Sequence, residues 1–195
     1  IRLENLYSDE ERWSDLEGLY ETWSSAEPDQ SKRQDVLLRM ADLFWSRLDN
    51  FSNALATFRQ ILSDDPAHSG VIEALEKRLE DADEDIENLG QVADVLEEAY
   101  GHLEGVVDWQ RWMGVYQAQS RAASDDQTKV DRLWRGAQII REQGQDMELA
   151  TSWYESLVEI DPLHAEALTI LDMYYAQQED WDPLARVLRL QLDFV

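Results

Sequence analysis

The chain repeats part of itself. Shifted by 96 positions, residues 13–68 align with residues 109–164 without a gap. The identical pairs include Trp13 and Trp109, Gly18 and Gly114, Tyr20 and Tyr116, Ala41 and Ala137, Ala54 and Ala150, Pro66 and Pro162, and His68 and His164. A repeat at a fixed offset is the signature of architectures in which each unit buries its apolar face against the next unit. We therefore expect the two segments to share one backbone shape, with four helices in each.

Apolar residues in these segments recur three and four positions apart, as one face of an α-helix requires. One such run is Leu37, Leu38, Met40, Ala41, Phe44 and Leu48. No stretch alternates β-branched and polar residues, so no sheet is expected. The expected helices span residues 1–7, 10–26, 31–48, 51–63, 68–79, 87–101, 106–122, 127–143, 147–160, 164–177 and 180–194. Ser31 and Asp146 stand where helix N-caps are expected, and Pro66 and Pro162 where helices have just ended.

The pattern of small, aromatic and proline residues in both segments resembles the tetratricopeptide repeat (TPR). In the first segment it consists of Ala41, Phe44, Ala54, Phe58, Ile61 and Pro66, and in the second of Ala137, Ile140, Ala150, Tyr154, Leu157 and Pro162. A second hairpin type alternates with the first and carries Trp13, Trp109 or Trp181 at its turn. The resemblance implies an all-α fold, a right-handed α-solenoid of TPR-like helical hairpins. It covers residues 1–195 as a single helical-repeat domain, with an inserted helix within about residues 76–92. The alternation resembles long bacterial solenoid proteins, and the chain is expected to be an excerpt of one.

In the TPR family the first helix of each hairpin lines a concave groove, so the resemblance implies a groove on this chain. Its lining would be Asp35, Leu38, Asp42, Trp45, Asp94, Glu98, Asp131, Trp134, Gln138 and Arg141. Family members that clamp a C-terminal carboxylate use Lys, Arg and Asn at such places, from which Leu38, Asp42, Trp134 and Gln138 depart. The expected partner is therefore a basic protein segment.

The net charge of -25, from 42 acidic and 17 basic residues, agrees with a basic partner. Such a surface repels phosphate backbones and anionic membranes, so nucleic-acid and membrane binding are not expected. No apolar run reaches the length of a membrane span. The absence of cysteine excludes disulfides and cysteine zinc sites. No targeting pattern is visible, and a cytoplasmic location is expected.

No residue constellation points to an enzyme, a cofactor or a metal. His68 and His164 share one repeat position, and a role at the start of a helix is favoured over a metal pair, because no His-x3-His spacing exists. The acidic stretch 80–87 begins like a calcium loop, but Ile86 and Val92 stand where glycine and glutamate are needed. This stretch is interpreted as a solvated loop, with weak cation binding left open.

The sequence leaves open the role of two tryptophans and the role of the chain as a whole. Trp45 and Trp134 either anchor a partner in the groove or are buried between hairpins. The chain itself is either a protein–protein interaction scaffold or a passive structural spacer within a larger assembly.

Both ends of the sequence are rich in apolar residues. These are Leu3, Leu6 and Tyr7 near the start, and Leu188, Leu190, Leu192, Phe194 and Val195 near the end. Terminal repeats usually carry a polar outer face, so these ends are expected to be covered by further repeats, by a partner or by self-association.

Overall fold

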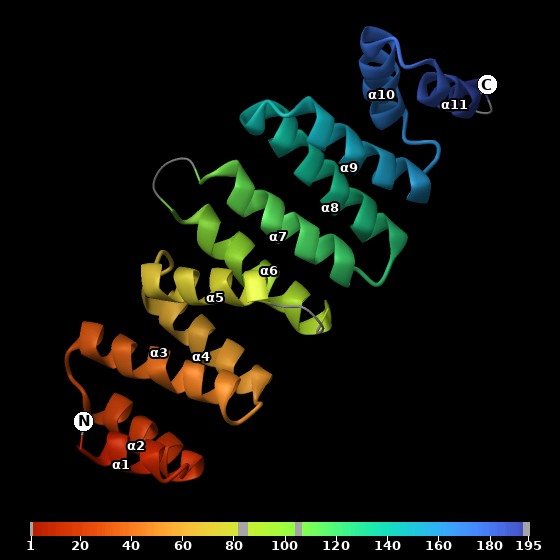
Figure 1. The fold of residues 1–195 in the computed structure, drawn as a ribbon. Coiled ribbons are helices and arrows are strands. Elements are labelled where there is room, and N and C mark those ends of the chain that lie inside the picture. Colours follow the sequence, from red (N-terminus) through yellow and green to blue (C-terminus); the bar gives the residue numbers. More distant parts are fainter. Residues whose placement is uncertain (1, 82–85, 104–106, 193–195) are drawn as a thin grey trace. The chain divides into compact units, whose positions relative to one another are not determined.

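The computed structural model describes residues 2–81, 86–103 and 107–192, and every regular element in them is helical (Figure 1). The chain divides into two compact units. Unit 1 comprises Ile1–Arg78 with Glu98–Leu103, and unit 2 comprises Leu79–Glu97 with Glu104–Val195. No described helix is long and apolar enough to cross a membrane.

Unit 1 is built from antiparallel helical hairpins in chain order. Its helices are α1 (Arg2–Asp9), α2 (Trp13–Ala26), α3 (Gln30–Ser46), α4 (Phe51–Asp64) and most of α5 (Ser69–Asp81). Helix α3 packs against α2 on one side and against α4 on the other. It is therefore the central helix of the unit, and seven of its side chains are buried.

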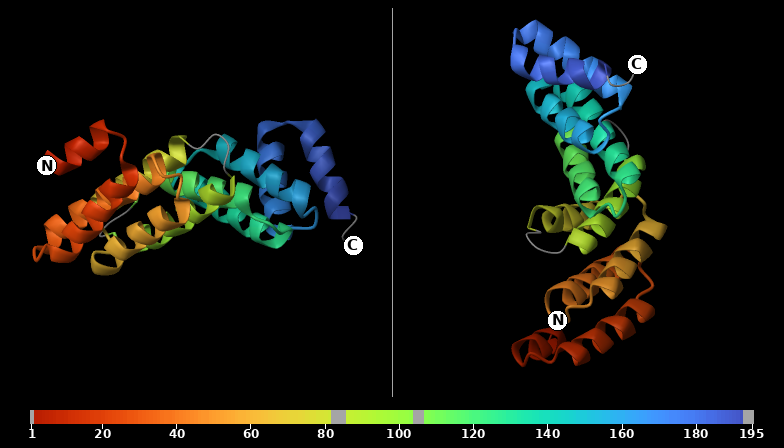
Figure 2. Two further views of the ribbon diagram at one scale, coloured as in Figure 1. Left: turned by 90° about the horizontal axis from the view of Figure 1, so that it is seen from below. Right: turned by 90° about the vertical axis from the view of Figure 1, so that its right-hand side faces the viewer.

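Unit 2 repeats this plan. Its helices are most of α6 (Ile86–Gly101), then α7 (Trp109–Ala122), α8 (Asp126–Ile139), α9 (Met147–Ile160), α10 (Ala165–Gln178) and α11 (Trp181–Leu192). A π-helical turn, η1 (Ile140–Gly144), extends α8. Helix α8 packs against α7 and α9, α9 packs against α10, and the hairpin of α10 and α11 follows (Figure 2).

The helices of the two repeated segments begin at positions 96 apart. Trp13 and Trp109 open α2 and α7, Gln30 and Asp126 open α3 and α8, and Phe51 and Met147 open α4 and α9. Each segment holds three helices, so the expectation of four was wrong: the fourth begins only after His68 and His164. Between α4 and α7 lie α5 and α6, whereas α10 alone lies between α9 and α11. The extra helix accounts for an offset of 96 between Trp13 and Trp109, against 72 between Trp109 and Trp181.

Small residues stand where two helices of a hairpin approach closely. Ala41, Ala54, Ala137 and Ala150 are completely buried. The aromatic residues of the next turn, Phe58 in α4 and Tyr154 in α9, are also completely buried. The alternation of small and large side chains lets the helices interdigitate without voids, which is the packing that the TPR signature implies.

Polar caps begin several of the helices. The side chains of Asp29, Asn50, Asp125 and Asp146 each accept a hydrogen bond from the backbone N–H three residues later. The prediction for Asp146 is confirmed, and that for Ser31 was wrong. Asp29 lies two residues earlier in the extended conformation that an N-cap needs, whereas Ser31 is already helical.

Candidate functional site

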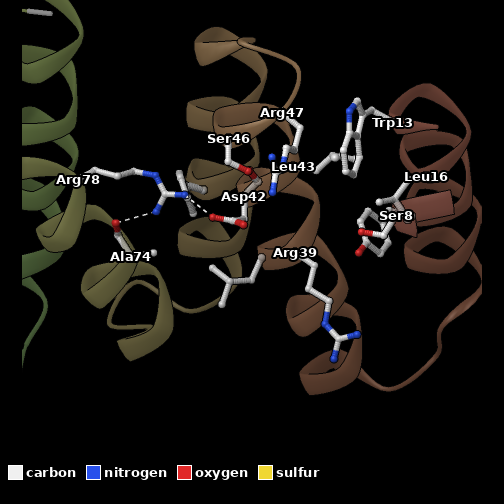
Figure 3. Close-up of a pocket in the computed structure, with 13 residues that line it drawn as sticks. Ser8, Trp13, Leu16, Arg39, Asp42, Leu43, Ser46, Arg47, Ala74 and Arg78 are labelled. Carbon is white, nitrogen blue, oxygen red and sulfur yellow. Dashed lines mark hydrogen bonds and ion pairs between the residues drawn. The ribbon is translucent and has the colours of Figure 1, made fainter. Parts of the chain in front are cut away.

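A cleft of about 520 Å³ lies within unit 1 around the central helix α3 (Figure 3). Its lining comes from all five helices of the unit. The lining residues are Ser8, Trp13, Leu16, Tyr20, Leu38, Arg39, Asp42, Leu43, Ser46, Arg47, Phe58, Ala74 and Arg78. Its volume falls within the range of ligand sites, roughly 300–1,000 Å³. Its lining combines apolar and polar side chains, which is the usual composition of a recognition site.

Arg78 enters the cleft from α5 and is largely buried. Its guanidinium donates to Asp42 Oδ1 at 2.8 Å and to the Ala74 carbonyl oxygen at 2.7 Å (Figure 3). The same guanidinium lies over two rings, 4.9 Å from the centroid of Trp45 and 5.2 Å from that of Phe58. Burial lowers the pKa of Arg78, while the charge of Asp42 acts in the opposite direction. An arginine remains cationic in any case, so Arg78 and Asp42 form a neutral pair.

Arg39 is tied to the first helix of the unit. It donates to Glu4 at 3.1 Å, and the Tyr20 hydroxyl donates to the same carboxylate at 2.7 Å. Burial and the hydrogen bond to Glu4 raise the pKa of Tyr20 well above its ordinary value, so this hydroxyl stays a donor. The second arginine of the cleft is therefore also paired with a carboxylate.

Arg47 differs from the other two arginines. It follows the last residue of α3, and its guanidinium lies 5.1 Å from the centroid of the Trp13 ring. Among the described residues no carboxylate lies within ion-pair distance of Arg47. The ring of Trp13 holds the guanidinium in place without neutralising its charge.

Basic side chains outnumber acidic ones in this cleft. Its lining holds three arginines and one carboxylate, Asp42. The sequence interpretation missed Arg47 and Arg78, because attention to the repeat favours the residues that recur. The second copy carries Gln143 at the position 96 residues after Arg47, and this difference was a signal available in the sequence. Arg78 lies beyond the repeated segment 13–68, so the repeat gave no signal for it.

The structure distributes the expected groove residues over several environments. Leu38 and Asp42 line the cleft of unit 1, and Trp45 lies beside it, half-buried, with its ring 5.0 Å from Phe51 of α4. Asp35 lies on α3 as well but is exposed and does not line the cleft. Glu98 is exposed near the end of α6.

In unit 2, Asp94 lines a cleft of about 420 Å³ with Gln91, Asp125 and Arg132. The buried amide of Gln119 donates to Asp94 at 2.8 Å and to Glu97 at 2.7 Å. These hydrogen bonds tie α7 to α6, so Asp94 has a structural role in addition to any contact with a partner.

The remaining expected residues lie on α8 and η1. Asp131 forms an ion pair with Arg135 at 3.1 Å, and Arg141 forms one with Glu142 at 3.2 Å. Gln138 is half-buried. Trp134 is half-buried against the core of unit 2, 5.5 Å from the Tyr154 ring and 4.9 Å from the His164 ring. Trp45 and Trp134 thus contact the second helix of their own hairpins and also the next hairpin, through Arg78 and His164, with part of each side chain still accessible.

The two repeated histidines cap helices. His68 Nδ1 accepts from the Val71 N–H at 3.2 Å, and His164 Nδ1 accepts from the Ala167 N–H at 3.3 Å. The favoured role at a helix start is confirmed. Among the described side chains no group of three potential metal ligands is found. Of the acidic stretch 80–87, residues 82–85 lie outside the described residues.

Comparison with models of protein families found no match, and comparison with curated proteins found none. Among solved structures, two are titled as the crystal structure of MamA; each is 13% identical to this chain, with TM-scores of 0.35 and 0.36. The first match covers 99% of this chain and 94% of that chain, and the second covers 97% and 86%. A third structure is titled "YrrB: a TPR protein with an unusual peptide-binding site" and is 17% identical, with a TM-score of 0.33 and coverage of 81% and 84%. The chain itself is built from TPR-like helical hairpins, a conclusion that rests on its own repeat and on the packing of its helices.

Proposed function

We propose that this chain is a protein–protein interaction scaffold that binds a segment of a partner protein in the cleft around α3. The observation that supports this most strongly is the cleft itself. It is lined by five successive helices, and its apolar lining residues include Leu16, Leu43 and Phe58. Helical-repeat proteins commonly use such faces to bind other chains.

The partner as a whole is proposed to carry positive charge. With 42 acidic and 17 basic residues, the chain generates a negative field that attracts a basic protein from a distance. Exposed carboxylates on the expected groove helices, such as Asp35 on α3 and Asp94 on α6, would meet basic side chains of the partner outside the cleft. Charge of this kind sets association rate and partner choice more than final affinity.

Position-specific photo-cross-linking in cells of the natural host tests the proposal. A photoreactive phenylalanine analogue replaces the half-buried Leu38 in the cleft, and in a matched control it replaces the exposed Arg59 on α4, outside the lining. We expect a defined cross-linked protein with the analogue at position 38 and not at position 59. Equal cross-linking at both positions, or none at position 38, would contradict a role for this cleft.

A passive spacer that associates through its ends is the second candidate. Leu3 and Leu6 on α1 are 52% and 45% exposed, and Leu192 on α11 is 73% exposed. Apolar side chains in such groups favour association. Sedimentation velocity at rising concentration tests this function. Oligomers that dissociate in the double variant Leu3→Lys, Leu192→Lys would support it, and a monomer at all concentrations would exclude it.

A further inference from the structure

The cleft of unit 1 already contains arginine side chains that lie against aromatic rings. The ring of Trp45 is covered by Arg78, and the ring of Trp13 by Arg47. A partner's lysine or arginine would have to displace these side chains in order to reach an aromatic face. Asp42, the one carboxylate in the lining, already binds Arg78 at 2.8 Å. Arginines outnumber carboxylates in the lining, which favours an acidic ligand group over a basic one.

The same cleft offers one unneutralised guanidinium. Arg78 is paired with Asp42, and Arg39 is paired with Glu4. Arg47 has no carboxylate within ion-pair distance among the residues that the structure describes. A guanidinium presents several N–H donors in a fixed fork, a geometry that matches the two oxygens of a carboxylate. Stacking on Trp13 limits the freedom of this side chain before a ligand arrives.

The two copies of the repeat differ at Arg47. Some residues recur 96 positions later, as Ala41, Ala54 and Trp13 do. Arg47 does not recur, because Gln143 occupies the corresponding position in the second copy. Asp49 and Gln145, two residues further on, share the left-handed conformation, with φ of 49° and 53°. The turns differ before that point, because Arg47 follows the end of α3 whereas Gln143 lies within the π-helical turn η1.

Apolar residues line the same cleft as this guanidinium, and of the leucines among them Leu38 is the accessible one. Leu16 and Leu43 are 4% and 5% exposed and line the same cleft as Arg47, together with the more accessible Leu38. Figure 3 shows Arg47 and Trp13 close to Leu43, between α2 and α3. A ligand that fits here presents a carboxylate and, beside it, an aliphatic or aromatic side chain.

We propose that the cleft recognises a partner segment in which an Asp or Glu side chain, bound by Arg47, lies near an apolar side chain that packs on Leu38. The lining extends from Ser8 of α1 to Arg78 of α5. This rests on the proposed function and adds the chemistry of the bound segment. The partner protein as a whole is still proposed to be basic. The one carboxylate that Arg47 binds determines how the partner segment is aligned in the cleft.

The test is selection from a phage-displayed library of random nonapeptides against the immobilised chain at physiological ionic strength. The wild-type chain is expected to enrich peptides with Asp or Glu beside an apolar residue. The Arg47→Gln variant, which carries the residue of the second copy, is expected to lose this preference. Arg59→Gln removes the same charge from an exposed site on α4 outside the cleft and is expected to keep it.

A selected peptide, acetylated and amidated so that its acidic side chain is the sole carboxylate, then gives the affinities by fluorescence anisotropy. Replacing its Glu by Gln should weaken binding to the wild type about tenfold, the size of one charge-assisted hydrogen bond, and should leave binding to Arg47→Gln nearly unchanged. Enrichment of basic peptides, or a Glu preference that survives in Arg47→Gln, would overturn the inference and leave the proposed function standing. Failure of the wild type to enrich any peptide would count against both.

Discussion

At the scale of single residues, Glu4 makes the stability of unit 1 depend on pH. Burial of this carboxyl raises its pKa, but the hydrogen bonds from Tyr20 and Arg39 outweigh burial and hold the pKa below its ordinary value of 4.5. A carboxyl whose pKa is lower in the folded state stabilises the fold above the unfolded pKa. This contribution is lost as the pH falls through the folded value.

The variant Glu4→Gln should therefore lower the free energy of unfolding at neutral pH by at most about 1 kcal/mol, since Arg39 is half-exposed. The difference from the wild type should shrink towards zero well below pH 4.5. Urea denaturation at neutral and acid pH measures it. A difference that stays constant over this range would show that the carboxylate charge contributes nothing.

Tyr154 carries a hydroxyl that the repeat does not need. The side chain is completely buried, and its hydroxyl has no hydrogen-bond partner among the described residues. Burial raises the pKa of Tyr154, so the hydroxyl remains a protonated donor. Phe58 fills the corresponding position of the first copy, also completely buried. A buried polar group without a partner costs about 1–3 kcal/mol.

We expect Tyr154→Phe to raise the free energy of unfolding by about 1 kcal/mol, because the substitution removes only the unpaired hydroxyl. Tyr175→Phe is the matched control, since it removes a hydroxyl that donates to Glu155 at 2.5 Å, and it should destabilise the chain. Chemical denaturation compares the two. A loss of stability in Tyr154→Phe equal to that in Tyr175→Phe would mean that its hydroxyl is satisfied.

At the scale of helices, Gly136 sets how closely α8 and α9 approach. A Cβ atom added at Gly136 would lie 2.0 Å from the ring of Trp153 in α9. Around Gly18 in α2 nothing lies within 4 Å of an added Cβ. Both glycines are helical, so the same substitution meets opposite surroundings.

Gly136→Ala should lower the free energy of unfolding by about 2 kcal/mol, because the core must shift to relieve the overlap. Gly18→Ala should raise it by about 0.5–1 kcal/mol, because alanine restricts the unfolded chain and favours the helix. Thermal and chemical denaturation of both variants give the signs. A stabilising Gly136→Ala would show that α8 and α9 are not in close contact.

The helices were largely predictable from the sequence, and the cleft was not. The spacing of apolar residues places α9 at its observed bounds and most other helices within about three residues, because burial of one face determines where a helix exists. The spacing of apolar residues did not predict the boundary between α8 and η1, because that boundary depends on backbone hydrogen bonding rather than on the pattern of side chains. The residues that face the cleft depend on contacts between side chains far apart in the sequence. Arg78 reaches Asp42 across 36 positions, and no local pattern encodes that pairing.

At the scale of the whole molecule, the excess of acidic residues predicts how a basic partner associates. Attraction between exposed charges is screened over about 8 Å at physiological ionic strength. The association rate constant should therefore fall by tenfold or more between low and physiological salt, while the dissociation rate constant changes little. Stopped-flow kinetics with the cross-linked partner measures both. A rate constant for association that is independent of salt would exclude electrostatic steering.

The central claim is that a partner segment binds in the cleft of unit 1, and nuclear magnetic resonance tests it most directly. The nitrogen-15-labelled chain is titrated with the peptide selected by the wild type, and the indole resonances are assigned with Trp13→Phe and Trp153→Phe. We expect the indole resonance of Trp13 and the backbone amide resonances of Leu43 and Arg47 to shift, and the indole resonance of Trp153 in unit 2 to stay unchanged. Shifts confined to Trp153 and its neighbours, with Trp13 unchanged at saturation, would contradict the central claim.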